Sequence, residues 1–233
     1  MRRAPIDVDV ARAQHAAYEE ALRDAGLTVE RLPAGPDTPD SVFIEDMAVV
    51  FDEVAIVMRP GAASRRAETA AVEEALRRHR PIRMIVPPGT IDGGDVLVAG
   101  RRVFIGRTTR TNDAAVEQME AILTPFGYTV CAVPVSGCLH LKSAVTALAD
   151  EVLIANRASA DMTRFDAFEI LDVDPAEPMA ANVVRLDDRI IFPTAFPRTA
   201  ERIAARGFQV RAVDVSELAK AEGAVTCCSL IVR

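Results

Sequence analysis

The sequence lacks the features of membrane-bound and secreted proteins. Its 233 residues contain no run of about 18 apolar residues, the length that a membrane-spanning helix requires. The N-terminal stretch MRRAPIDVDV carries basic side chains but no apolar core of a signal peptide. Only four cysteines are present, and Cys227 and Cys228 are neighbours, which seldom pair with each other. We therefore expect a cytoplasmic protein with free thiols.

Common signatures of nucleotide and metal sites are also missing. The stretch GTIDGGD lacks the Lys-Ser/Thr ending of a phosphate-binding loop and the GxGxxG pattern of a dinucleotide site. No pair of CxxC motifs and no HxxxH motif accompanies the adjacent cysteines, so a structural zinc site is not expected. Cys131 and Cys138 are expected to have no special role. The net charge of −7 disfavours nucleic acid and anionic membranes as partners but admits a cationic small molecule.

What the sequence does contain is a repeated unit of helix and strand. Half of the residues are apolar, which suffices for one domain over residues 1–233. Apolar residues recur at helical spacing in five segments, and a short apolar strand follows each of them. The predicted helices are 11–26, 64–80, 111–127, 161–169 and 197–207, and the predicted strands are 27–34, 82–88, 128–135, 169–175 and 208–215. Between successive units lie two apolar runs around a polar turn, as in VLVAG-RR-VFIG, which predict hairpins.

The hairpins recur at a nearly constant interval. Aligning them brings five polar residues into one column at steps of 49, 47, 40 and 46 residues: Asp46, Asp95, Lys142, Asn182 and Cys228. This period is typical of a radial array of five blades, in which equivalent strand starts meet at a central axis. A two-layer α/β domain with polar residues in its turns is the alternative.

The fifth hairpin has only one predicted strand, SLIVR, at the C-terminus. No apolar strand precedes the first helix to pair with it, so we expect the closing blade to be incomplete. An unpaired strand edge would favour association with a second copy, which predicts a homodimer.

Candidate catalytic groups lie just before the column. Nucleophilic catalysis needs a nucleophile, a proton carrier and a group that orients the carrier, and a cysteine, His140 and an aspartate supply this set. His140 is the histidine of the three that lies outside the predicted helices. Glu45 and Asp46 precede an apolar strand, where buried carboxylates require a cation. A ligand guanidinium would satisfy them bidentately, and an arginine of the protein is the alternative.

Several strings resemble one known family. PDSVFIEDMAVV, RPGAASRR, IDGGDVLVAGRRVFIGRTTRTN, LHLKS, AAN and TCCS resemble, in this order, the dimethylarginine dimethylaminohydrolases of the guanidine-modifying superfamily. The resemblance runs from about Val8 to the C-terminus. It implies a five-bladed α/β propeller of the pentein type and hydrolysis of asymmetric dimethylarginine or monomethylarginine to citrulline and a methylamine. The implied route passes through a covalent cysteine thiouronium, without metal or cofactor.

The resemblance also implies roles for individual residues. Cys227 would be the nucleophile, His140 the general acid and base, and Asp92 the acid that orients the histidine. Cys228 would have no catalytic role. Glu45 and Asp46 would bind the guanidinium, Phe43 would form an apolar wall, and the remaining residues would hold the amino-acid end: Asp40, Arg65 and Arg110.

Two expectations concern reactivity. Acidic neighbours should raise the pKa of the Cys227 thiol, and a bound cation should lower it again. Members of the family begin earlier, with a strand and a loop over the pocket, so this chain is expected to exclude water less well and to be less active. Two other functions stay open: a deiminase or hydrolase of free arginine or another guanidine, and a non-catalytic ligand-binding member.

Overall fold

The hairpins that the sequence predicts are present, and each is extended by a third strand. The computed structural model describes residues 5–33 and 37–232, which form four three-stranded sheets. In each sheet the first two strands pair antiparallel and the third pairs parallel to the second. The sheets are β1 Ala48–Val50, β2 Ala55–Val57 and β3 Ile82–Met84; β4 Val96–Ala99, β5 Arg102–Arg107 and β6 Thr129–Pro134; β7 Val145–Ala149, β8 Val152–Ala155 and β9 Glu169–Asp172; β10 Val184–Leu186, β11 Arg189–Pro193 and β12 Gln209–Val213.

Helices connect the second and third strands of the sheets. Such a crossover is required because a short turn cannot join two parallel strands. Asn112 caps one of these helices by accepting a hydrogen bond from the Ala115 N–H at 3.1 Å. The α-helices are α1 Val8–Asp24, α2 Thr69–Leu76, α3 Asp113–Leu123, α4 Pro197–Ala204 and α5 Ser216–Ala219. The 3-10 helices are η1 Ile44–Met47, η2 Ala63–Glu68, η3 Gly93–Asp95, η4 Thr124–Phe126, η5 Leu141–Ser143, η6 Met162–Phe165 and η7 Thr226–Cys228.

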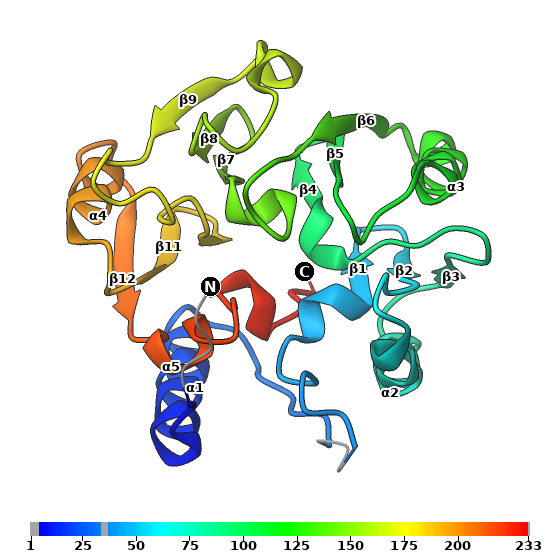
Figure 1. Ribbon diagram of the computed structural model, residues 1–233, viewed down its shortest axis with the longest axis horizontal. Coiled ribbons are helices and arrows are strands. Elements are labelled where there is room, and N and C mark those ends of the chain that lie inside the picture. The colour runs from blue at the N-terminus through cyan, green and yellow to red at the C-terminus, as the bar shows by residue number, and fades with distance from the viewer. Residues whose placement is uncertain (1–4, 34–36, 233) are drawn as a thin grey trace.

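The four sheets stand around a common centre, with α2, α3 and α4 on the outside (Figure 1). The sector between the fourth and the first sheet holds α1, α5 and the C-terminal segment (Figure 1). The expected radial arrangement of hairpin, helix and strand units is therefore confirmed, and the two-layer alternative is not.

The hydrophobic core is divided among the interfaces between neighbouring units. One cluster joins the first two sheets with α3, a second joins the second and third sheets, and a third joins the third and fourth. A fourth cluster packs α1 and the C-terminal segment against the fourth sheet, and a fifth packs α2 and the chain end against the first. Each unit thus buries its apolar faces only by contact with both neighbours, as expected of a closed ring.

Three predicted elements differ from the structure. The segment 27–33 is extended but pairs with no strand among the described residues, because Leu27 and Val29 pack against the α1 cluster instead. Residue 34 of that prediction lies outside the described residues. The predicted helix 161–169 is reduced to the single turn η6, since Phe165 and Phe168 both point into the core between the second and third sheets.

The predicted C-terminal strand has no partner. Residues 229–232 pair with no strand in the described part of the chain, although Ile231 packs into the α1 cluster. The closing blade is thus incomplete over the described residues, as expected, and association of this segment with a second copy stays a prediction. No helix within residues 5–33 and 37–232 is long and apolar enough to cross a membrane.

Candidate active site

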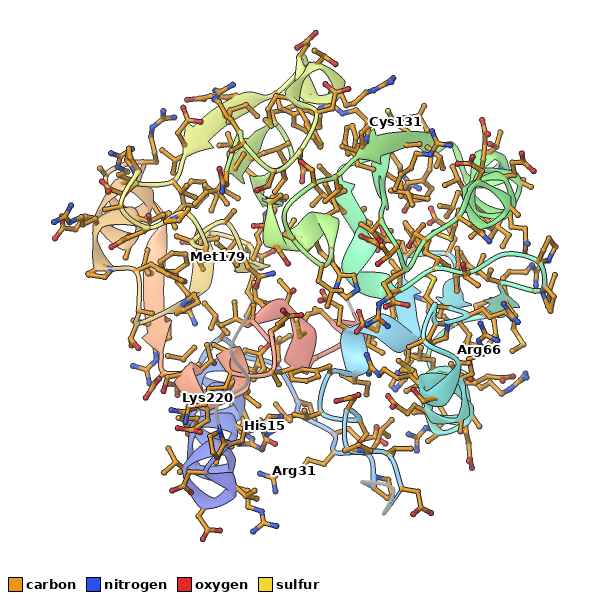
Figure 2. All side chains as sticks on the ribbon, viewed as in Figure 1. His15, Arg31, Arg66, Cys131, Met179 and Lys220 are labelled. Atoms are coloured by element: carbon orange, nitrogen blue, oxygen red, sulfur yellow. The ribbon has the colours of Figure 1, made fainter. Side chains whose placement is uncertain are left out.

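Four 3-10 turns meet at the centre of the ring. η1, η3 and η5 each lead into the first strand of a sheet, and η7 leads into the C-terminal segment. Hydrogen bonds join adjacent turns: the Gly94 N–H donates to Asp46 Oδ1 at 3.1 Å, and the Leu141 N–H donates to Asp95 Oδ1 at 2.9 Å. The aligned column of polar residues therefore lies where the turns converge. By contrast, His15 on α1 and Cys131 on β6 lie toward the outside (Figure 2).

Asp92 and His140 form a buried hydrogen-bonded pair. His140 Nε2 lies 3.1 Å from Asp92 Oδ2, and Asp92 Oδ1 accepts a hydrogen bond from the Gly61 N–H at 2.8 Å. Asp46 Oδ1 is the next acid, 3.9 Å from the same ring nitrogen. Burial disfavours the charged imidazole, but the bond to Asp92 and the charges of Asp46, Asp95 and Asp92 outweigh it and raise the pKa of His140 above 6.5. Protonation of the ring is therefore favoured relative to a free imidazole.

Cys227 lies in η7 beside two of the acids. Its thiol accepts a hydrogen bond from the Ala224 N–H at 3.4 Å, which favours the thiolate. Burial and the charges of Glu45 and Asp46 act in the opposite direction and raise the pKa of Cys227 well above 9.0. Burial, and then Glu45, raises the pKa of Cys228 to about 12. The expected effect of the acids on the thiol is thus confirmed for the unliganded chain.

The two glycines of the IDGGD motif make the close approach of the turns possible. A Cβ atom at Gly94 would lie 2.6 Å from His140 Nδ1 and 3.0 Å from Asp46 Oδ1. A Cβ atom at Gly93 would overlap the backbone oxygen of Glu45. Only glycine leaves room for the histidine ring and the η1 turn at this distance. The motif that showed no phosphate-binding pattern therefore has a packing role in the site.

Arg65 makes contacts with two carboxylates of the protein. Its Nη1 lies 2.5 Å from Asp46 Oδ2, and its Nη2 lies 2.8 Å from Glu68 Oε2. The same Nη2 donates to the backbone oxygens of Asp40 and Phe43 at 3.0 and 2.9 Å. The internal arginine that the sequence left open as a partner of Asp46 is thus present. Arg65 also holds the backbone of the segment from Asp40 to Phe43.

The other expected substrate-binding residues are less tightly engaged. Arg110 Nη1 lies 3.9 Å from Asp92 Oδ2, and 30% of the Arg110 side chain is exposed. Asp40 is exposed, and Phe43 is partly buried against Gly223, where a Cβ atom would overlap the ring. These positions leave the Arg110 guanidinium and the Asp40 carboxylate accessible to a ligand at the side of the turns.

Glu45 has partners for both carboxylate oxygens. Lys142 Nζ lies 2.5 Å from Oε1, and the Thr226 hydroxyl donates to Oε2 at 2.8 Å. No sequence pattern marks Thr226 as a site residue. Lys142 and Asn182 belong to the polar column of the aligned hairpins, and this position is the signal that marks them in the sequence.

The acids and the histidine form the grouping best able to hold a cation. Ligand atoms of Asp46, Asp92 and His140 lie within 4.8 Å of one another. Arg65 already places a positive charge 2.5 Å from Asp46 Oδ2, so part of the negative charge is balanced within the protein.

Comparison with known proteins gives the family. A family model described as "N,N dimethylarginine dimethylhydrolase, eukaryotic" matches residues 3–232. An N(G),N(G)-dimethylarginine dimethylaminohydrolase of Streptomyces coelicolor is 44% identical over 236 residues, covering 100% of this chain and 90% of that protein. The chain belongs to the dimethylarginine dimethylaminohydrolase family. The protein of the same name from Pseudomonas aeruginosa is 38% identical over 226 residues, covering 95% of this chain and 89% of that one.

Solved structures share the fold. A cysteine-to-serine variant of the Pseudomonas aeruginosa enzyme, complexed with citrulline, matches with a TM-score of 0.94 and 36% identity over 99% of this chain and 91% of that one. The N-terminal domain of ArgZ, a cyanobacterial arginine dihydrolase, has the same fold at 19% identity, with a TM-score of 0.87 over 97% of this chain and 87% of that one. The predicted pentein-type α/β propeller is confirmed.

The contact between Gly94 and His140 gives a first prediction. Gly94→Ala should displace the histidine ring and lower kcat by about 100-fold, since misplacement of a catalytic group by about 1 Å costs on that order. Citrulline formation from asymmetric dimethylarginine measures this, with chemical denaturation of the same samples as the stability reference.

Gly127→Ala is the control for stability. Gly127 has φ 79°, and a Cβ atom there would have no neighbour within 4 Å, so alanine costs about 1–2 kcal/mol through backbone strain alone. This variant should keep its kcat. Equal kcat values for Gly94→Ala and the wild type would contradict the packing role.

The Asp92–His140 pair gives a second prediction. Asp92→Asn removes the negative charge and should lower the pKa of His140, followed by NMR titration of the ring. Because the folded pKa lies above 6.5, the pair stabilises the protein fully below pH 6.5 and less as the pH rises through the folded pKa. The stability deficit of Asp92→Asn should therefore shrink with rising pH, whereas an unchanged His140 pKa would contradict the assignment. Asp166→Asn, at an exposed aspartate at the end of η6, is the matched charge-change control.

Proposed function

We propose that this chain hydrolyses asymmetric dimethylarginine or monomethylarginine to citrulline and a methylamine. The observation that carries the proposal is that His140 and Cys227 share one acidic environment. Asp46 lies 3.9 Å from His140 Nε2, and its charge also raises the pKa of the Cys227 thiol. A nucleophile, a proton carrier and the acids that attract a guanidinium are thus gathered in a chain of this family.

The contacts support the following roles. Cys227 is the nucleophile, His140 the general acid and base, and Asp92 the residue that orients the imidazole through the 3.1 Å bond. Asp46 faces the guanidinium, and Glu45 adds a further negative charge. Asp40, Phe43 and Arg110 contact the amino-acid end and the alkyl chain. Arg65, whose guanidinium is buried against Asp46 and Glu68, serves this end of the substrate by holding the backbone from Asp40 to Phe43.

The first half of the reaction forms the covalent intermediate. A bound guanidinium offsets the charges of Glu45 and Asp46, so the Cys227 thiol loses its proton to solvent. The thiolate attacks the guanidinium carbon, and the electron pair of the C=N bond moves to nitrogen. His140, protonated because of its raised pKa, gives its proton to the dimethylamine nitrogen as the C–N bond breaks. A thiouronium on Cys227 and a neutral His140 remain.

The second half uses the neutral imidazole as a base. His140 removes a proton from a water molecule, which attacks the same carbon. Collapse of this adduct breaks the C–S bond and forms the carbonyl of citrulline, and the proton of the adduct's hydroxyl passes to the departing sulfur, which restores the Cys227 thiol. His140 is again protonated, and its bond to Asp92 keeps the ring in the same place in both halves.

Citrulline formation tests the function directly. The chain should release citrulline from asymmetric dimethylarginine, and Cys227→Ser should lower this rate by at least about 1000-fold, since a serine hydroxyl is not ionised here. Cys228→Ser is the matched control and should stay active. Arginine assayed in parallel identifies a deiminase if it is turned over faster. Binding of methylated arginine without turnover of either compound would identify a ligand-binding protein.

The ionisation of Cys227 gives a further prediction. The ultraviolet absorbance of the thiolate, corrected with Cys227→Ser, should titrate at lower pH when a cationic arginine analogue that is not turned over is bound. Its positive charge stabilises the thiolate next to Glu45 and Asp46. Citrulline, whose side chain is neutral, is the matched control and should shift the titration less. The same titration midpoint with both compounds would exclude substrate-assisted ionisation.

A further inference from the structure

The turn that carries the nucleophile is held differently from the other three. η1, η3 and η5 are each continued by a strand that pairs in a sheet, so the ladder fixes their positions. η7 is followed by residues 229–232, which pair with no strand among the described residues. Within the described part of the chain, no strand ladder fixes Cys227 relative to His140, so its position depends on the packing of residues 229–232 and on the side-chain contacts of η7 itself.

Thr226, the residue before Cys227, makes three of these contacts. Its hydroxyl donates to Glu45 Oε2 at 2.8 Å and accepts from Asn182 Nδ2 at 2.9 Å. Its backbone N–H donates to Asn182 Oδ1 at 3.0 Å. All three residues are buried, so these bonds are shielded from water and restrict the geometry of the turn.

These contacts are part of a closed network that includes η5, the turn that follows His140. Asn182 Nδ2 also donates to the backbone oxygen of Lys142 at 3.0 Å, and Lys142 Nζ lies 2.5 Å from Glu45 Oε1. The network thus runs from Glu45 in η1 through Thr226 in η7 and Asn182 to Lys142 in η5, which contacts Glu45 again. It connects the turn of the nucleophile with the turns that carry Asp46 and the residues next to His140.

We propose that Thr226 and Asn182 are positioning residues, which fix Cys227 at its attacking distance from the guanidinium carbon by tying η7 to η1 and η5. The proposal rests on the proposed function for its kinetic part. Neither residue has to touch the substrate. Loss of a contact should therefore affect the chemical step more than substrate binding.

Kinetics with asymmetric dimethylarginine test the role of the hydroxyl. Thr226→Val keeps the shape and removes the hydroxyl, and it should lower kcat by at least about 10-fold while KM changes by less than about 3-fold. Thr226→Ser restores the hydroxyl and should recover most of the lost kcat. Thr199→Val, in which a buried threonine hydroxyl of α4 is lost far from the turns, is the control and should keep its kcat.

Asn182→Ala tests the same contacts from the other side. It leaves the bond between Thr226 and Glu45 in place and should give the same pattern of lowered kcat and nearly constant KM. Circular dichroism shows whether Thr226→Val folds. If it does not, the kinetics of Asn182→Ala test the proposal in its place. Wild-type kcat in either folded variant, or a loss confined to KM, would overturn the proposal.

Alkylation of Cys227 separates this proposal from the proposed function. Iodoacetamide modification, followed at Cys227 by peptide mass spectrometry across pH, needs no turnover. Thr226→Val removes the donor to Glu45 Oε2 and frees the turn, so the pH dependence of alkylation should shift relative to the wild type and to Thr199→Val. If the wild type forms no citrulline, the proposed function is wrong. The alkylation profile of Cys227 then tests the positioning role by itself. An unchanged alkylation profile in Thr226→Val would then overturn the positioning role.

Discussion

Four carboxylates, those of Glu45, Asp46, Asp92 and Asp95, lie buried where the 3-10 turns meet. A buried carboxylate without hydrogen-bond donors or a cation costs several kcal/mol. Each of the four is accordingly supplied with donors from a neighbouring turn or from a basic side chain. Satisfying these acids requires the turns to approach closely, and the close approach in turn requires the glycines of the IDGGD motif. The arrangement of the ring centre follows from this constraint.

The same buried charge sets the reactivity of the site. It raises the pKa of His140, and it adds to burial in raising the pKa of the Cys227 thiol. In the proposed mechanism a guanidinium offsets the charges of Glu45 and Asp46 beside the thiol, while Asp92 keeps its bond to the histidine. Selectivity for a cationic substrate and activation of the nucleophile would then have a common electrostatic origin.

Much of the fold could be predicted from the sequence, because the hairpins combine strong apolar patterns with short polar turns. The predicted strands that do not form a ladder contain apolar residues but have no strand to pair with. Leu27 and Val29 are apolar, yet they pack against α1. The segment 161–169 failed for a related reason. Its two phenylalanines both enter the core next to Phe104, a placement that a single 3-10 turn achieves and that helical spacing alone does not reveal.

The sequence by itself determined the repeat, the acids at the start of the first two hairpins, the glycines at the start of the second, and the presence of one histidine and one cysteine pair at equivalent places. Only the tertiary structure decided which charges meet. Arg65 pairs with Asp46, 19 residues away, and Thr226 pairs with Glu45, 181 residues away. Hydrogen bonds and ion pairs act over a few ångströms in space, so their partners depend on how the ring closes. Sequence pattern specifies the charged groups, whereas closure of the ring specifies their neighbours.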